Sequence, residues 1–197
     1  MTSDENGQNA KADLPSGDSD LDAASHLLAD LHCDLPGKVT RFRHLADLCG
    51  TLGSQGTILF GGSTTFTAWT EARSSFVHGN FAATVLLCQS LLESLLAAFL
   101  HLDPMKDDLP PRIAFRDTLM RCQDENLISG QDLGDLERLM GLRNPLSHFR
   151  PVADDQNIVR RAMMVGIHPD ALIEQDAWFA IDITVRMLAK PPFRLGR

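Results

Sequence analysis

The stretch that decides the fold is Phe81–Leu102, which reads FAATVLLCQSLLESLLAAFLHL. Its apolar residues recur at alternating spacings of four and three, at Phe81, Val85, Cys88, Leu92, Leu95 and Phe99. Further leucines fill the other faces, and between Phe81 and Leu100 the only charged residue is Glu93. A helix that is apolar nearly all round has to lie at the centre of a bundle or at a subunit contact. The sequence therefore predicts a core helix here rather than a membrane span.

Helical periodicity continues on both sides of this stretch, and no segment reads convincingly as a strand. Caps and breakers predict helices at Ser19–Cys33, Val39–Leu52, Ser63–Gly79, Pro110–Asn126, Gln131–Leu142, Asn157–Met164 and Asp170–Leu188. Leu35-Pro36-Gly37 is expected to end the first of these helices. The fold class is therefore expected to be all-α.

The N-terminal region differs in composition from the rest. Residues 1–20 are rich in Asp, Ser, Gly, Asn and Gln and nearly free of large apolar side chains, which predicts a disordered acidic tail. We expect an N-terminal helical extension over residues 21–60 and a helical bundle domain over residues 61–197. With 197 residues, 44% hydrophobic and 22% charged, the chain has the profile of one soluble globular domain with an appendage.

The net charge of −8 is concentrated at the N-terminus, where residues 1–25 hold six carboxylates against Lys11 alone. The remaining body is close to neutral. It does not have the charge of a general polyanion-binding protein, so a nucleic-acid contact would need a local basic site.

The four cysteines are scattered, at Cys33, Cys49, Cys88 and Cys122, without a C-x-x-C pair. No secretory leader is evident at the start. Reduced thiols in a cytoplasmic protein without membrane attachment are the expectation.

A short motif, Arg143-Asn144-Pro145-Leu146-Ser147-His148, carries the chemistry of the chain. Asn followed by Pro is a helix-start signal, so the preceding helix is expected to stop near Leu142 and a new turn to begin at Pro145. On one unbroken helix, residues five apart would lie roughly 140° apart around the axis. A break at the proline is the predicted means by which the Arg143 and His148 side chains converge.

The same Arg-x4-His spacing occurs a second time, at Arg73 and His78. That pair falls in what reads as an uninterrupted helix ending at Gly79. We therefore expect its members to diverge and treat it as a coincidental match.

An Arg and a His held together can cleave an RNA phosphodiester without a metal. A histidine with the ordinary pKa of about 6.5 can take the proton of a ribose 2′-hydroxyl near neutral pH. The guanidinium fork matches the phosphate oxygens on which charge develops. Because this route needs a 2′-hydroxyl, RNA is the expected substrate and DNA is not.

Arg143-Asn144-x-x-x-His148 resembles the R-x4-6-H signature of the HEPN superfamily, in which a polar residue often follows the Arg. Ala72-x3-Phe76-x2-Gly79-Asn80-Phe81, which leads into the apolar helix with Glu93, is similar to that family's first two core helices, and Asp170–Leu188 resembles its last. The likeness covers about Ser63–Ala189. It implies an up-and-down bundle of four to five core helices, with the N-terminal helices as additions, and a homodimer whose two motifs face each other.

The resemblance also implies a function. Many members are metal-independent ribonucleases that act as toxins or in phage defence, and an antitoxin or nucleotidyltransferase is the kind of partner expected. In this reading His148 is the base, Arg143 the phosphate clamp, Asn144 an orienting residue and Glu93 a supporting carboxylate. Other members bind nucleotides or proteins without cleavage, so a non-catalytic helical dimer is the alternative function.

Each candidate residue also has a structural alternative. Asn144 can be a helix cap, Arg143 can pair with Glu93 or a helix end, His148 can be a half-buried polar residue, and Glu93 can be solvated beside Ser90 and Ser94. The basic residues expected to attract RNA, or simply to be exposed, are Arg150, Arg160 and Arg161. No cofactor and no metal are expected, because the only close set of soft ligands is His26, His32 and Cys33.

Overall fold

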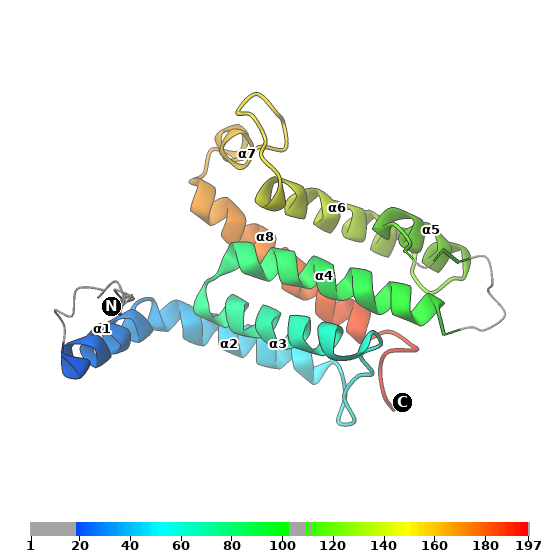
Figure 1. Ribbon diagram of the computed structural model, residues 1–197, viewed down its shortest axis with the longest axis horizontal. Coiled ribbons are helices and arrows are strands. Elements are labelled where there is room, and N and C mark those ends of the chain that lie inside the picture. The colour runs from blue at the N-terminus through cyan, green and yellow to red at the C-terminus, as the bar shows by residue number, and fades with distance from the viewer. Residues whose placement is uncertain (1–18, 103–108, 111, 197) are drawn as a thin grey trace, which may run out of the picture. The chain divides into compact units, whose positions relative to one another are not determined.

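The structure is a computed structural model that describes residues 19–102, 109–110 and 112–196. These residues form eight α-helices and no strand, apart from an isolated antiparallel bridge between Thr57 and Arg194. The helices are α1 (Asp20–His32), α2 (Leu35–Gly50), α3 (Gly62–His78), α4 (Phe81–Leu100), α5 (Phe115–Asp124), α6 (Gly130–Ser147), α7 (Ile158–Val165) and α8 (Pro169–Leu188), as Figure 1 shows. The expected all-α helical bundle is confirmed.

The chain divides into two compact units, with the boundary in the sequence between Pro36 and Gly37. In the first unit, α1 starts with a capping box between Ser19 and Asp22 and has no buried residue. An acidic tail is expected over residues 1–20. Residues 1–18 of it lie outside the described residues, whereas Ser19 is the cap of α1 and Asp20 is its first residue. The division expected at residue 60 also differs from this grouping, because Leu45 and Leu52 belong to the hydrophobic core of the second unit.

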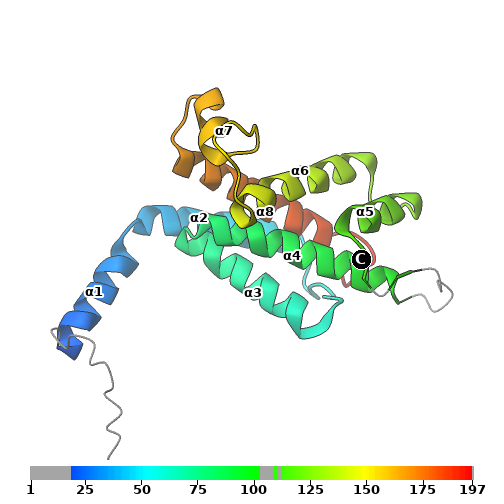
Figure 2. The same ribbon diagram turned by 45° about the horizontal axis from the view of Figure 1, so that its top comes forward.

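Helix α4 is the centre of the second unit and packs against α3, α5, α6 and α8 (Figures 1 and 2). Val85, Leu91 and Leu95 are fully buried. Burial also raises the pKa of the Cys88 thiol to about 12, although a hydrogen bond with Thr184 acts in the opposite direction. Among the described helices, α4 alone is long and apolar enough to cross a membrane by length and composition. A helix at the centre of a bundle has the same length and apolar composition, because other helices cover it.

A turn of two residues folds α4 back on α3. Gly79 ends α3 in the left-handed conformation (φ 83°), where its N–H bonds the Phe76 carbonyl and the next N–H, of Asn80, bonds the Ser75 carbonyl. Arg41 of α2, which is buried, donates from Nε to the Val77 carbonyl at 3.1 Å. This buried guanidinium therefore satisfies a carbonyl at the C-terminal end of α3.

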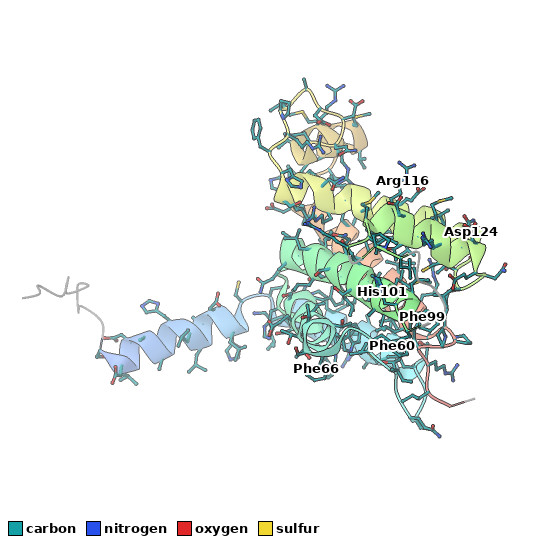
Figure 3. The ribbon with its side chains drawn as sticks, turned by 45° about the vertical axis from the view of Figure 1, so that its right-hand side comes forward. Phe60, Phe66, Phe99, His101, Arg116 and Asp124 are labelled. Carbon is teal, nitrogen blue, oxygen red and sulfur yellow. The ribbon has the colours of Figure 1, made fainter. Side chains whose placement is uncertain are left out.

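Aromatic side chains close the end of the bundle where α4 stops. The Phe60, Phe99 and Phe193 rings lie 5.5 to 6.0 Å apart between centroids, and Figure 3 labels the first two. Phe66, near the start of α3, is 61% exposed (Figure 3). The buried face of α3 is formed by Trp69, Ala72 and Phe76.

Two helix starts differ from the sequence expectation. Helix α2 begins at Leu35, so its first turn contains Leu35-Pro36-Gly37, which was expected only to end the preceding helix. A proline is tolerated there because the N–H groups in the first turn of a helix have no intrahelical partner. Helix α5 begins at Phe115, after Ala114 in an extended conformation, and not at Pro110.

Candidate functional site

Helix α6 carries the Arg143 motif, and its first turn is firmly held. Asp132 N donates to Ser129 Oγ at 3.2 Å, and Ser129 N donates in return to Asp132 Oδ2 at 2.8 Å. Lys190, which follows α8, also approaches Asp132 Oδ2, at 2.7 Å. Burial acts to raise the pKa of Asp132, but the hydrogen bonds from Lys190 and Ser129 outweigh it and lower the pKa. The start of α6 is thereby fixed by an ionised, hydrogen-bonded carboxylate.

The helix does not stop at Leu142, so the predicted break at the proline is wrong. Helix α6 runs through Arg143 and Asn144 to Ser147, with Pro145 inside it. Pro145 has no N–H to bond the Gly141 carbonyl, but the helix tolerates this loss one turn from its end. Asn144 consequently lies within a helix and is not the cap of a new one.

The helix ends instead at His148, whose backbone is extended (φ −134°, ψ 137°). Its N–H still bonds the Asn144 carbonyl at 3.0 Å, while the Ser147 hydroxyl donates to the Arg143 carbonyl at 3.2 Å. Because His148 has left the helical path, its side chain is not bound to the 140° separation of an unbroken helix.

The Arg143 and His148 side chains meet, with 3.4 Å between Arg143 Nη1 and His148 Nε2. A guanidinium can only donate, so this contact requires Nε2 of His148 to be the unprotonated ring nitrogen. Arg143 is half-buried and His148 exposed. The arrangement places an imidazole nitrogen and a guanidinium in contact at a surface that is accessible to solvent.

A pocket of about 340 Å³ adjoins His148. It is bordered by Pro145 and Phe149 on one side and by Asn157 and the first residues of α7 on the other. Asn157 accepts hydrogen bonds from the N-terminal amides of α7 and donates to the Arg150 carbonyl at 2.8 Å. This one side chain therefore holds the segment after His148 against the start of α7.

The three arginines expected to attract RNA each have a carboxylate partner. Arg150 Nη1 lies 3.3 Å from Asp154, and Arg160 Nε lies 2.7 Å from Asp155. Arg161 makes two bonds, of 2.9 and 3.0 Å, to the buried Asp176. Arg150 also borders the pocket at His148, and its Nε is buried without a hydrogen-bond partner among the described residues. Of the three, Arg150 is the best placed to act with the pair.

Glu93 makes its hydrogen bond within its own helix. Its carboxylate accepts a hydrogen bond of 2.8 Å from Gln89, which is buried one turn earlier on α4. The structure records no hydrogen bond or ion pair between Glu93 and either Arg143 or His148, all of which it describes.

Two residues of the site were missed by sequence reasoning. Phe149 follows the motif directly and is 91% exposed. Asn157 was placed at the start of a short helix but not connected to the motif. A large aromatic residue in an otherwise polar segment, and an Asn ahead of an apolar run, were the available signals. Their position beside His148 depends on the path of the loop between α6 and α7.

Within residues 19–102, 109–110 and 112–196, no group of three or more His, Cys, Asp or Glu side chains is close enough together to hold a metal ion.

Comparison of the chain with protein-family models, with curated proteins and with solved structures finds no match.

Proposed function

We propose that this protein is a metal-independent endoribonuclease of the HEPN type. The observation that carries the proposal is the 3.4 Å approach of Arg143 Nη1 to His148 Nε2 at a solvent-reached surface beside a pocket. The unprotonated Nε2 that this contact requires is the form in which an imidazole acts as a base.

In the proposed reaction, Arg143 turns from His148 to the phosphate, and the freed Nε2 of His148 takes the proton from a ribose 2′-hydroxyl. The 2′-oxygen attacks the adjacent phosphorus, the bond from phosphorus to the 5′-oxygen breaks, and that oxygen takes a proton from solvent. Arg143 donates to the phosphate oxygens as negative charge develops on them. The products are a 2′,3′-cyclic phosphate and a 5′-hydroxyl end.

Two neighbouring residues fit a single-stranded substrate. Phe149 offers an exposed ring on which a base next to the reacting phosphate can stack. Arg150 retains one donor that has no partner among the described residues. We assign to Asn144 a role in orienting Arg143, and to Arg160 and Arg161 only a contribution to the local positive field, since both are paired with carboxylates.

The experiment that tests the proposal is cleavage of single-stranded RNA in EDTA by the wild type and by His148→Ala. We expect the variant to cleave about 10²- to 10⁴-fold more slowly, as for loss of a general base. His148 is exposed, so the substitution should leave thermal unfolding unchanged. DNA of the same sequence should remain intact, and a single ribonucleotide placed in that DNA should define the one site of cleavage.

Equal inertness of both proteins toward RNA would contradict the nuclease and favour the second candidate, a non-catalytic helical dimer that binds a partner. A specific observation supports this alternative. Large apolar side chains are exposed between the end of α6 and the end of α7, at Phe149, Val152, Val159, Met163, Met164 and Val165. Exposed apolar side chains are typical of protein interfaces where they gather in a patch.

Both candidate functions, the nuclease and the non-catalytic binding protein, include a homodimer. In the nuclease, two motifs would face each other across the interface, as the HEPN resemblance implies, and an antitoxin or nucleotidyltransferase would cover or modify them. A cytoplasmic location and a role as a toxin or phage-defence effector are part of the same proposal. Sedimentation of the wild type and of Met163→Ser/Met164→Ser would test whether these methionines hold the dimer.

A further inference from the structure

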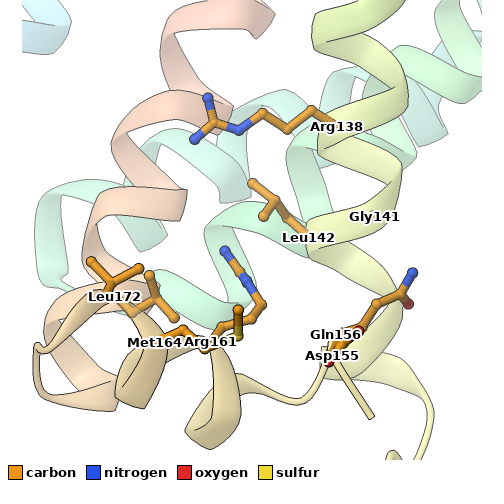
Figure 4. A pocket seen from close by; sticks show the side chains of 9 residues that line it. Arg138, Gly141, Leu142, Asp155, Gln156, Arg161, Met164 and Leu172 are labelled. Atoms are coloured by element: carbon orange, nitrogen blue, oxygen red, sulfur yellow. The ribbon is translucent and has the colours of Figure 1, made fainter.

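Another pocket among the described residues has a lining that does not include His148. It has a volume of about 510 Å³ and is enclosed by α6, the loop before α7, α7 itself and the first turns of α8 (Figure 4). This volume lies in the range of sites for small organic ligands.

The walls of this pocket are mainly apolar. Leu142 of α6 and Leu172 of α8 are buried, at 7% and 5% exposure. Met164 and Val165 of α7 are 73% and 62% exposed at the same pocket. A ligand with an apolar body would cover these two side chains, which the chain itself leaves in water.

The charges at the pocket are unequally balanced. Arg161 reaches into it but is neutralised by its paired bonds to Asp176, and Asp155 is neutralised by Arg160. Arg138 extends from α6 toward α8 (Figure 4), with its guanidinium 4.0 Å from the centroid of the Phe179 ring. It has no ion-pair partner within the part of the chain that the structure describes. One positive charge at the pocket is therefore left uncompensated.

We propose that this pocket binds a small amphipathic anion, with an aromatic body against Leu142, Leu172 and Met164 and its carboxylate, sulfonate or phosphate group on Arg138. The Phe179 ring holds the guanidinium in place, which reduces the ordering cost of binding the anion. The inference goes beyond the proposed RNA cleavage and does not depend on it, because its test measures binding alone.

Gly141 gives a way to fill the pocket without disturbing the fold. A Cβ added there would meet no atom within 4 Å, although Gly141 borders the pocket. Gly134, on the same helix, is also open to a Cβ but lies outside the pocket. Leucine at either position also suits a helix better than glycine does. Gly141→Leu and Gly134→Leu therefore form a matched pair of test and control.

The test is a fluorescence titration of the full chain with two probes. 8-Anilinonaphthalene-1-sulfonate has the proposed chemistry, and N-phenyl-1-naphthylamine is its uncharged analogue. We expect Gly141→Leu to weaken binding of both probes by at least about tenfold, because the aromatic body loses its place on the pocket wall. Gly134→Leu should bind both probes as the wild type does. Arg138→Gln should weaken the sulfonate about five- to tenfold and leave the uncharged probe unchanged.

Three outcomes would overturn the proposal. Binding of the sulfonate by Gly141→Leu as tightly as by the wild type would place the probe elsewhere. Equal loss of both probes in Arg138→Gln would show that Arg138 shapes the pocket without binding the anion. If sedimentation shows that Gly141→Leu converts a wild-type dimer to a monomer, a second copy of the chain occupies the pocket. Circular dichroism of each variant verifies that the helices are retained.

Discussion

Two regions of this protein carry the same Arg-x4-His spacing, and only one of the two pairs forms a hydrogen bond. On α6 and just beyond it, Arg143 and His148 are 3.4 Å apart between Nη1 and Nε2. On α3, Arg73 and His78 both border a pocket of about 300 Å³ next to α2, but no hydrogen bond between them is recorded. The spacing alone therefore does not make a site.

The difference arises from where each helix ends. His78 is still the last residue of α3, and the turn away from the helix occurs only at Gly79. Arg73 is also engaged elsewhere, with its guanidinium 5.4 Å from the centroid of the Trp69 ring. His148 is already outside α6 and extended, so it is free to approach Arg143. Arg143 and His148 approach each other because the last helical residue, Ser147, falls between them.

Among the changes that compare the two regions, the largest effect is expected from removing one arginine of each pair. Arg143→Ala should lower RNA cleavage about 10²- to 10³-fold, as for loss of a donor to the charge that develops in the transition state. Arg73→Ala should cleave as the wild type does. Initial rates on the same labelled RNA in EDTA measure both. Equal loss of activity in the two variants would contradict the proposal that the Arg143–His148 pair, and not the Arg73–His78 pair, takes part in cleavage.

A second prediction concerns the N-termini of the same two helices. Helix α3 begins after Gly61 without a side-chain cap, whereas α6 begins with Ser129 and the buried Asp132. Because the pKa of Asp132 is lowered in the folded chain, its stabilising contribution is fully present above the ordinary carboxyl pKa of about 4 and is lost as the pH falls through the folded value. Asp132→Asn should therefore cost about 2 kcal/mol at neutral pH and progressively less in acid.

Urea unfolding of the wild type and Asp132→Asn, from neutral pH down to about pH 3, measures this difference. Asp47→Asn, on an exposed face of α2, is the control and should show no such trend. A stability difference for Asp132→Asn that does not change with pH would refute the role assigned to its ionised carboxylate.

A third prediction tests whether Pro145 is needed for the pair. In Pro145→Ala the new N–H can bond the Gly141 carbonyl, so we expect a gain in stability of about 1 kcal/mol. Cleavage should change little, because the extended backbone of His148, and not the proline, ends the helix. Loss of cleavage in a more stable variant would instead mean that removing the proline lets α6 continue through His148 and separates the pair.

The smallest effect is expected at Glu93. Since its carboxylate is bonded to Gln89, Glu93→Gln should leave RNA cleavage within about twofold of the wild type, a change below the range of lost catalytic groups. A fall comparable to that of Arg143→Ala would show that Glu93 reaches the pair in the complex with RNA. Thermal unfolding of the variant separates that outcome from a loss of packing.

Much of the helical architecture was predictable, because apolar periodicity and capping residues act locally. The long segments Ser63–Gly79, Phe81–Leu102 and Asp170–Leu188 match α3, α4 and α8 closely. The errors lie where two local signals compete. Asn144-Pro145 favours a helix start, yet the packing of Leu139 and Leu142 in the core keeps α6 intact across it. The burial of Arg41 against the end of α3 depends on the packing of α2 on α3, which no local pattern indicates.

The residues of the candidate site were predictable from the sequence, but the backbone path that brings them together was not. Arg143 and His148 could be singled out from their chemistry and spacing, whereas their convergence was attributed to the proline. The carboxylate partners of Arg160 and Arg161 could not be foreseen. Asp155 comes from the loop before α7, and Asp176 from α8.

The sequence by itself determined that this chain is a helical bundle around Phe81–Leu100, because a helix apolar on every face is stable in water only when other helices cover it. The tertiary structure alone decided which of two identical spacings places a guanidinium beside an imidazole. That outcome depends on the residue at which α6 gives way to extended backbone. The end of a helix is set by the packing and capping of its neighbours as much as by its own residues.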